Sequence, residues 1–205
     1  MDYAKISDDN SIDMTVKALA ERNVEAIVVA TKEEALAKIK EWIPQGVSVM
    51  NGASQTLEAI GFVEYLKSGT HGWNNLHAMV AAEQDPAKRA ALRKQALFSD
   101  FYLGSVHALA QTGEFVVASA SGSQIPHIAF TSPNLVFVVG AQKIVPTLDE
   151  ARKRVADYVF PLEDARMKST GAPGSIFSKE FIFHREPAVM GRKVRMIIVK
   201  EALGF

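Results

Sequence analysis

The sequence predicts an α/β fold in which a mixed, partly parallel sheet is flanked by helices. Two observations predict this class: helical and strand-like patterns alternate over the first fifty residues, and the second half is richer in short apolar runs. An alternating order of helices and strands favours parallel strands that are covered by helices. At 205 residues the chain is long enough for one sizeable core, so we expect a single domain over residues 1–205.

The first helix and the first strand follow from hydrophobic periodicity. Ile12, Val16 and Leu19 recur at helical spacing, and Asn23 can close this helix in a left-handed conformation. Residues 24–30 then form an apolar run, which predicts a buried strand.

The second helix opens with a capping box, because Thr31 is followed three residues later by Glu34. The apolar stripe of this helix ends at Ile43, since the segment 44–46 contains a proline and a glycine that break it. Residues 47–50 predict a short strand after this break.

The middle of the chain predicts helices first and strands afterwards. Short helices are expected over residues 57–66, and Asp85 followed by Pro86 starts a helix that runs to about Ser99. The strands expected after it are residues 101–108, 115–118 and 135–139. A long amphipathic helix begins near Thr147.

The final part, residues 166–205, is expected to lie outside the minimal core. Residues 167–178 contain two glycines and a proline and predict a flexible connection. Two closing strands, 181–183 and 194–199, are expected to pair as a hairpin around residues 187–192.

Composition excludes several classes of function. Lys plus Arg equals Asp plus Glu at 23 each, so the net charge is zero and no basic face for nucleic acid is expected. The chain has no cysteine, which removes disulfides, thiolate nucleophiles and cysteine-ligated zinc or iron–sulfur sites. The polar N-terminus is unlike a signal peptide, and no apolar run reaches the roughly 18 residues of a membrane span. We therefore expect a cytoplasmic protein without nucleic-acid or membrane partners.

The five histidines show no spacing typical of a metal site, so no metal is expected. His107 and His127 lie among the expected pocket segments and are candidate polar walls of a pocket. Trp73 and the segment 171–178 are candidate interface elements of a homo-oligomer.

The first candidate site is the loop 51–56, between a strand and a helix. Free N–H groups at a helix start, together with hydroxyl side chains, form a natural anion site, and glycine lets a ligand approach closely. The predicted binding residues here are Asn51, Gly52, Ser54 and Thr56. The alternative is that Ser54 or Thr56 merely caps the helix. The loop lacks the lysine and glycine spacing of a P-loop.

The second candidate site is the hairpin around the turn at residues 111–113. Its predicted binding residues are Gly104, Ser105, Thr112 and Gly113. Asp100 at its entrance and Glu114 beside the turn are the candidate catalytic residues, because a partly buried carboxylate can act as a base or nucleophile. The alternatives are an ordinary turn and a solvated Glu114 at a strand edge.

The third candidate site is the small-residue loop 119–124, together with a lysine after the next strand. Small hydroxyl residues and glycine can surround an anion, and a lysine supplies a point charge. The predicted binding residues are Ser119, Gly122 and Lys143. The alternative places Lys143 in solvent at the end of its strand.

These motifs resemble the lactate utilization (LUD) domain family, with the small, cysteine-free LutC/YkgG subunit as the nearest type. Residues 104–113 carry the pattern G-x-x-x-A-x-A-Q-T-G, and residues 139–151 read VGAQKIVPTLDEA. Residues 51–61 match the family's early serine–threonine motif. The resemblance covers most of the chain and places the core of the domain at about residues 10–165.

The resemblance implies a fold like that of ribose-phosphate isomerases, glucosamine-phosphate deaminases and CoA transferases. It also implies a role in bacterial oxidation of L-lactate to pyruvate, beside partner subunits that carry iron–sulfur clusters, with no cofactor in this chain. This chain has Gln111 where the family often has Glu, and Gly122-Ser123-Gln124 where the family has Gly-Asn-Arg. The missing arginine removes a bidentate contact to an anion.

We therefore expect a non-redox subunit or accessory factor in organic-acid metabolism that binds a small anionic metabolite. The alternative is a stand-alone enzyme acting on a phosphosugar or an acyl-CoA, with Glu114 or Asp100 as base or nucleophile; it rests on fold-level analogy. A third hypothesis is a regulatory module that binds a ligand without turnover.

Overall fold

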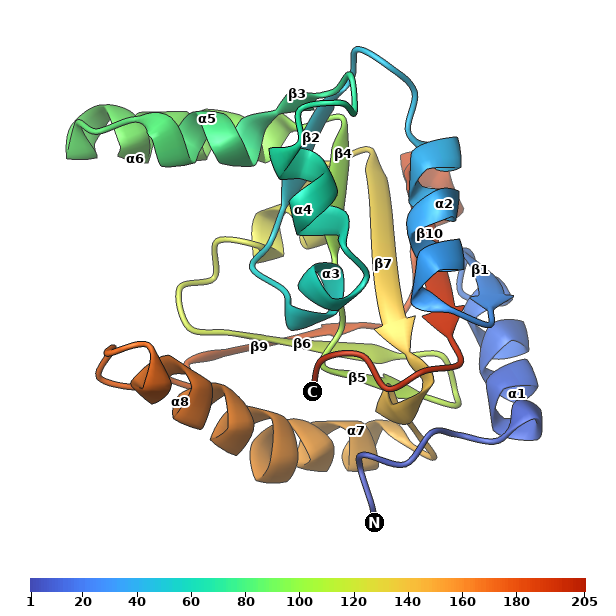
Figure 1. Ribbon diagram of the computed structural model, residues 1–205. Coiled ribbons are helices and arrows are strands. Elements are labelled where there is room, and N and C mark those ends of the chain that lie inside the picture. Colours follow the sequence, from blue (N-terminus) through green and yellow to red (C-terminus); the bar gives the residue numbers. More distant parts are fainter.

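In the computed structural model, which describes residues 1–205, two β-sheets form the centre of the molecule (Figure 1). The larger sheet has six strands in the order β1-β10-β7-β4-β2-β3, and every neighbouring pair is parallel. Its strands are β1 (Val24–Val29), β2 (Ser48–Asn51), β3 (Asn74–Asn75), β4 (Phe101–Gly104), β7 (Asn134–Gly140) and β10 (Lys193–Val199). Their carboxyl ends therefore lie at one edge of the sheet, which is where open α/β sheets bind ligands.

The smaller sheet has four strands in the order β8-β5-β6-β9. They are β5 (Ala108–Ala110), β6 (Phe115–Ser119), β8 (Ile144–Val145) and β9 (Lys179–Phe183). Strands β5 and β6 form an antiparallel hairpin with Gly113 at φ 92°, which confirms the predicted turn. Strand β8 is parallel to β5, and β9 is antiparallel to β6.

Eight α-helices surround the sheets (Figure 1). They are α1 (Asp9–Ala20), α2 (Lys32–Trp42), α3 (Gln55–Ala59), α4 (Phe62–Lys67), α5 (Leu76–Ala82), α6 (Pro86–Gln95), α7 (Leu148–Arg154) and α8 (Phe160–Ser169). The shorter 3₁₀ and π segments are Ala96–Phe98, His127–Thr131, Ala141–Lys143, Val155–Val159 and Ala188–Met190. Helices α5 and α6 project away from the sheets, and no residue of α6 is buried. None of the helices combines the length and the hydropathy that a membrane crossing requires.

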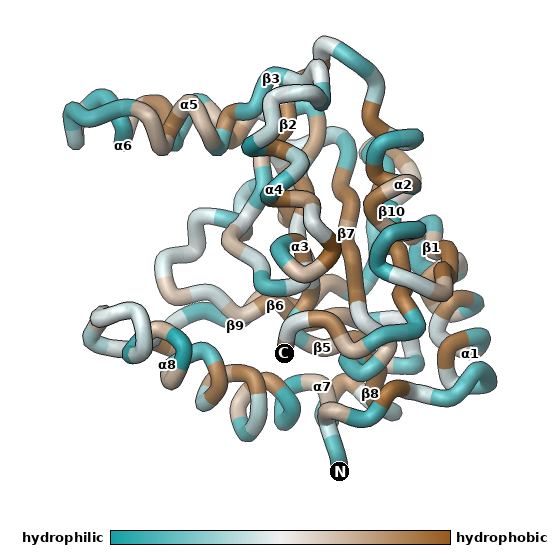
Figure 2. The backbone as a smooth tube through the Cα atoms, in the orientation of Figure 1, coloured by the Kyte–Doolittle hydropathy of each residue, from teal (hydrophilic) through white to brown (hydrophobic).

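Strand β7 separates two hydrophobic cores, because its side chains alternate between the faces of the large sheet. Figure 2 shows β7 largely in the brown of hydrophobic residues. Leu135 and Phe137 pack into the core that contains α1 and the small sheet. Val136 and Val138 pack into the core that contains α2, α3 and α4. A smaller third core lies between the small sheet and α7. The continuous apolar run of β7 is thus explained by burial on both faces.

Local signals in the sequence place several helix ends correctly. Thr31 accepts the N–H of Glu34 at 3.3 Å, and the Glu34 carboxylate accepts the N–H of Ala30, one residue earlier than in a standard capping box. Asp85 caps α6 by accepting its first two N–H groups. Asn23 adopts the left-handed conformation, with φ 58°, after α1.

Three strand predictions are wrong, each for a tertiary reason. The predicted strand 101–108 ends at Gly104 and continues as β5 in the other sheet. The expected hairpin of 181–183 and 194–199 does not form, because β9 pairs with β6 while the apolar β10 lies between β1 and β7. The run 24–30, expected to be buried, forms the edge strand β1, whose four middle residues are not buried.

Candidate functional site

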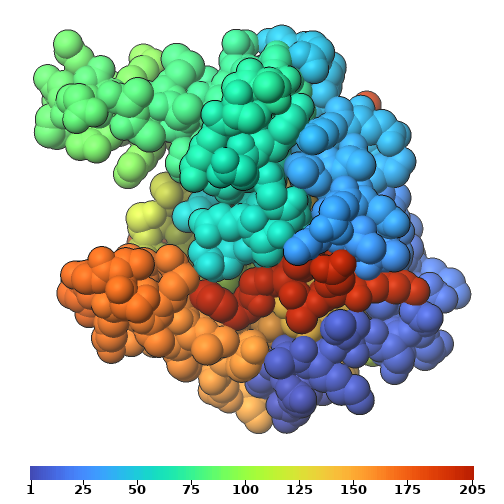
Figure 3. All heavy atoms as spheres, viewed as in Figure 1, coloured from blue at the N-terminus to red at the C-terminus, as the bar shows by residue number.

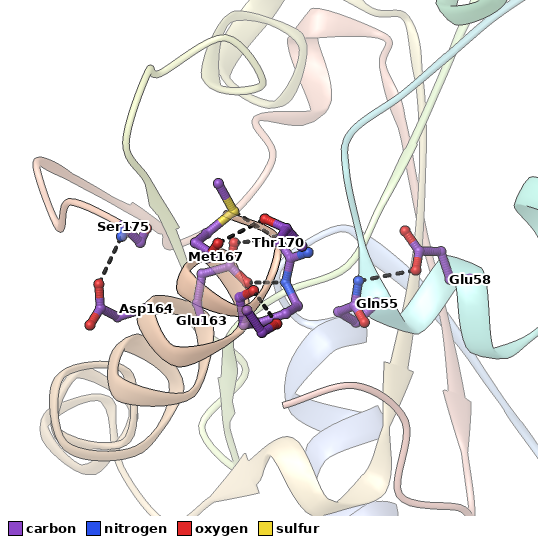
Figure 4. A network of polar contacts seen from close by, with 9 residues as sticks. Gln55, Glu58, Glu163, Asp164, Met167, Thr170 and Ser175 are labelled. Carbon is purple, nitrogen blue, oxygen red and sulfur yellow. Dashed lines mark hydrogen bonds and ion pairs between the residues drawn. The ribbon is translucent and has the colours of Figure 1, made fainter. Parts of the chain in front are cut away.

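A cavity of about 360 Å³ opens at the carboxyl-end edge of the large sheet. Its sheet-side wall consists of residues 52–56 after β2, residues 104–107 after β4, parts of 118–124 after β6, and Lys143. The opposite α8 wall comes from α8, the π segment before it, and residues 175–177. Figure 4 looks into the space between α3 and α8, and Figure 3 shows the C-terminal residues, in red, crossing this face between the two helices.

Glycine at position 52 is required by a neighbouring tyrosine. Strands β2 and β4 are adjacent and parallel, and Asn51 lies opposite Leu103. The N–H of Gly52 donates to the carbonyl of Leu103 at 3.1 Å. A Cβ at Gly52 would lie 2.5 Å from the Tyr102 hydroxyl, a distance at which the side chains would have to move apart. The loop can therefore approach β4 this closely only with glycine at this position.

The two hydroxyl residues of the 51–56 loop have different roles. Ser54 caps α3 by accepting the N–H of Leu57 at 3.2 Å, so the capping alternative holds for this residue. Thr56 is buried, and its Oγ1 donates to the carbonyl of Leu203 at 3.1 Å and accepts from Lys143 Nζ at 2.9 Å. Because α3 has only five residues, its dipole is short, and the chemistry here depends on the side chains.

Lys143 is buried in the sheet-side wall and is 3% exposed, so the solvated alternative is wrong. Its Nζ donates to Thr56 Oγ1, to Ser105 Oγ at 3.2 Å and to the carbonyl of Val106 at 3.2 Å. No carboxylate forms an ion pair with it. Burial, together with the positive charge of Arg154, lowers the pKa of Lys143 to about 7.

A second cationic side chain, Arg154 of α7, is fully buried behind His107. Its guanidinium donates to the carbonyls of His107 and Tyr3, and its Cζ lies 5.1 Å from the ring centre of Tyr158. It forms no ion pair, and its Nε has no hydrogen-bond partner. Burial lowers the pKa of Arg154 to about 10. The sequence contains one signal for it, because Arg154 falls on the apolar stripe of residues 148–158.

His107 lines the cavity in its neutral form. Its Nδ1 accepts the N–H of Ala118 at 3.1 Å, so the ring proton lies on Nε2. Burial, together with the charges of Lys143 and Arg154, lowers the pKa of His107 to about 3. Lys143 and Arg154 are therefore two buried cationic groups with no carboxylate partner and a neutral imidazole beside them.

The α8 wall contains none of the residues predicted from the sequence. The rings of Phe160 and Phe177 lie with their centroids 6.0 Å apart. Glu163 and Arg166, three residues apart on α8, form a bidentate ion pair with two N–O distances of 2.7 Å (Figure 4). Helix α8 continues to Ser169, so the start of the expected flexible connection is helical. The sequence of α8 gives no sign of a ligand, since the helix has no distinct apolar face and only the tertiary fold brings it opposite β2 and β4.

Seven predicted binding residues lie on the cavity wall: Gly52, Ser54, Thr56, Gly104, Ser105, Ser119 and Lys143. The other four lie outside it. Asn51 is buried, and its Oδ1 has no hydrogen-bond partner. Thr112 and Gly113 form the β5–β6 turn, which packs against α1. Gly122 lies against the side chain of Lys179.

Neither candidate catalytic carboxylate lines the cavity. Glu114 forms an ion pair with Arg22 and accepts the hydroxyl of Thr112. Asp100 accepts the N–H and the hydroxyl of Ser48 at 2.8 and 2.7 Å, at the amino end of β2 and β4. These bonds hold the pKa of Asp100 below its ordinary value. Both carboxylates thus make structural contacts away from the cavity.

The remaining polar candidates lie elsewhere. His127 is buried and stacks on Tyr102 with the ring centroids 4.5 Å apart, and it does not line the cavity. No group of three or more His, Cys, Asp or Glu side chains is arranged to hold a metal ion.

Comparison with known proteins identifies a family and a fold. The family model described as the LUD domain matches residues 12–176. A crystal structure of a DUF162 family protein from Deinococcus radiodurans superimposes with a TM-score of 0.55 at 13% sequence identity. That alignment covers 95% of this chain and 99% of the other, and at this identity it shows a common fold. No curated protein matches the sequence.

Proposed function

The chain belongs to the LUD domain family, and on this premise we propose that it binds a small organic anion beside Lys143 as part of organic-acid metabolism. In the role that the family suggests, the utilization of L-lactate, the chain acts as a non-redox subunit or accessory factor. Its partners in this proposal are subunits that carry iron–sulfur clusters, since the chain has no cysteine of its own to ligate a cluster.

The observation that carries the proposal is the buried ammonium of Lys143 on the cavity wall, which has no carboxylate partner, with the unpaired Arg154 buried behind His107. A buried charge is unfavourable unless a counter-charge and hydrogen bonds compensate for it. An anion in the cavity would supply that counter-charge and raise the pKa of Lys143. The Ser105 hydroxyl, which accepts from Nζ, can turn its one O–H from the carbonyl of Val106, at 3.3 Å, towards an anion, whereas the O–H of Thr56 is already donated to the carbonyl of Leu203.

No contact in the structure favours the alternative of an enzyme that uses Glu114 or Asp100. The carboxylate of Glu114 is occupied by Arg22 and Thr112. The carboxylate of Asp100 is occupied by Ser48 at the far end of its strand. The proposal therefore concerns binding and assigns no role in catalysis to either residue.

A ligand screen followed by calorimetry tests this proposal. The purified protein is screened by thermal shift against lactate, pyruvate, a phosphosugar and a CoA ester, and each hit is titrated. A ligand at about 100 times its Kd adds roughly 2.7 kcal/mol to the free energy of unfolding. We expect an organic acid to bind and Lys143→Met to weaken it by about 10- to 150-fold, the value of a charge-assisted hydrogen bond.

Lys38→Met is the matched control, because Lys38 is an exposed lysine on α2 that pairs with Glu41. It should bind the acid as the natural sequence does. Equal affinity in Lys143→Met and Lys38→Met would exclude Lys143 as the anion-binding group. A screen in which only the phosphosugar or the CoA ester binds would overturn the organic-acid assignment.

A further inference from the structure

The cavity is larger than a three-carbon acid requires. Its volume is about 360 Å³, and a water molecule in the liquid occupies roughly 30 Å³, so the cavity holds about a dozen waters. A three-carbon hydroxy acid has about half as many non-hydrogen atoms as that. A ligand that filled the cavity would therefore extend well beyond the contacts of Lys143.

The two walls of the cavity differ in chemistry. The sheet-side wall carries the hydroxyls of Thr56 and Ser105 and the ammonium of Lys143. The α8 wall presents Phe160 and Phe177, and Ile176 beside them is 70% exposed. Large apolar side chains left exposed around a hollow commonly mark a binding site, and ligand pockets combine mostly apolar walls with a few polar groups.

The apolar segment of the α8 wall is held in place by named contacts. The Asp164 carboxylate accepts the N–H of Ser175 at 2.8 Å (Figure 4). It also accepts the ammonium of Lys168 at 2.6 Å. Gly174 has φ 120°, a conformation that other residues rarely adopt, and it lies against Asp164. The contact between Asp164 and Ser175 holds the loop against α8, so Phe160 and Phe177 both belong to the folded wall.

The charges on the α8 wall compensate each other. Arg166 donates two hydrogen bonds to Glu163, and this carboxylate raises the pKa of Arg166. On the α3 side, the Glu58 carboxylate accepts from the amide of Gln55 at 3.0 Å (Figure 4). The uncompensated positive charge of the cavity is thus confined to the sheet-side wall, and the α8 wall is left to apolar contact.

We propose that the ligand is an organic acid with an apolar body, larger than lactate. Its carboxylate takes the place of Ser105 Oγ as an acceptor of Lys143 Nζ and accepts the Ser105 hydroxyl, and its hydrocarbon or aromatic part packs on Phe160 and Phe177. This inference rests on the proposed function, because it uses the same anion site and specifies the class of acid that the site takes.

A homologous series of acids tests the inference by calorimetry. The probes are the 2-hydroxy acids from lactate to 2-hydroxyhexanoate, together with 3-phenyllactate. Each buried methylene contributes about 0.8 kcal/mol, so the Kd should fall about fourfold for each added methylene until the wall is covered. Lys143→Met should weaken every member of the series by a similar factor, because it removes the contact to the common carboxylate.

Substitutions in the α8 wall should weaken the binding of the apolar part of the ligand and leave the binding of its carboxylate unchanged. Phe177→Ala, a change at a partly exposed residue of a loop, should remove most of the gain along the series and leave the Kd for lactate nearly unchanged. Phe160→Ala should act in the same way. The control is Phe98→Ala, since Phe98 is 77% exposed and does not line the cavity.

Three results would overturn the inference, and they are distinguishable. If all acids of the series bind with the same Kd and Lys143→Met abolishes binding, the anion site exists, and the proposal that the ligand has an apolar part on the α8 wall is wrong. If no acid of any length binds the natural sequence, both the inference and the proposed function are wrong. A gain along the series that Phe98→Ala removes as fully as Phe177→Ala does would also exclude the proposed wall.

Discussion

Two regions of the molecule bury a basic side chain, and they treat its charge differently. Arg192 faces Glu186, with side chains 6% and 5% exposed and an N–O distance of 3.7 Å. Lys143 is buried to the same degree but faces two hydroxyls and a carbonyl. The first charge is compensated within the chain and the second is not. A buried basic side chain that has a counter-ion within the chain is expected to have a structural role. A buried basic side chain without one can take its counter-ion from a ligand.

The two regions also lie at opposite edges of the large sheet. Arg192 directly precedes β10 and donates to main-chain carbonyls of His127, Ile128 and Ser132. Lys143 follows the carboxyl end of β7, at the edge where parallel α/β sheets bind ligands. The uncompensated charge is thus found at the carboxyl-end edge of the large sheet, and the compensated one at the amino-end edge.

The largest effect is expected at the compensated region. Arg192→Met leaves Glu186 buried without its partner and removes the bonds to three carbonyls, so it should lower the free energy of unfolding by about 3–5 kcal/mol. Glu186→Gln should cost less, about 1 kcal/mol, because Arg192 keeps its hydrogen bonds to the three main-chain carbonyls. Urea unfolding measures both. If Glu186→Gln lowers the free energy of unfolding more than Arg192→Met does, the prediction that Arg192 makes the more stabilising contacts is wrong.

A smaller effect is expected for Arg154→Met. The change removes donors to the carbonyls of His107 and Tyr3, which should lower the free energy of unfolding by about 1–3 kcal/mol. It also removes a positive charge near Lys143, so the pKa of Lys143 should rise. An NMR titration of the lysine side chain measures this pKa. An unchanged pKa would show that the two cations do not interact.

The remaining prediction is a pH dependence that belongs to Lys143 alone. Its pKa is about 7 in the folded chain against an ordinary 10.5, so between these values the unfolded chain binds the extra proton. Stability from this group therefore rises with pH across this window, by at most about 1.4 kcal/mol per pH unit, and is lost as pH falls towards 7. The unfolding free energy of the natural sequence should therefore rise relative to that of Lys143→Met as the pH increases across this window. A difference that stays flat from neutral to alkaline pH would contradict the uncompensated burial of Lys143.

The sheet-side wall could be predicted from the sequence, whereas the α8 wall could not. Gly52, Thr56 and Lys143 follow short apolar strands, and the ends of parallel strands meet at one edge of a sheet. Phe160 and Glu163 belong to a helix without a distinct apolar face, and nothing in their spacing indicates which loop they face. Similarly, the apolar run of β10 predicts a strand but does not specify its neighbours, which is why the expected hairpin is wrong.

The sequence by itself determined the α/β class, the helix starts at Thr31, Asp85 and Thr147, and the family motifs, because these depend on residues within one turn or one strand of each other. Only the tertiary structure decided the order of the strands and whether each buried charge has a counter-ion. Lys143 meets Thr56 across 87 residues, and Thr56 meets Leu203 across 147. The burial that lowers the pKa of Lys143, and the lack of a carboxylate near it, are properties of packing between distant segments, which no local pattern records.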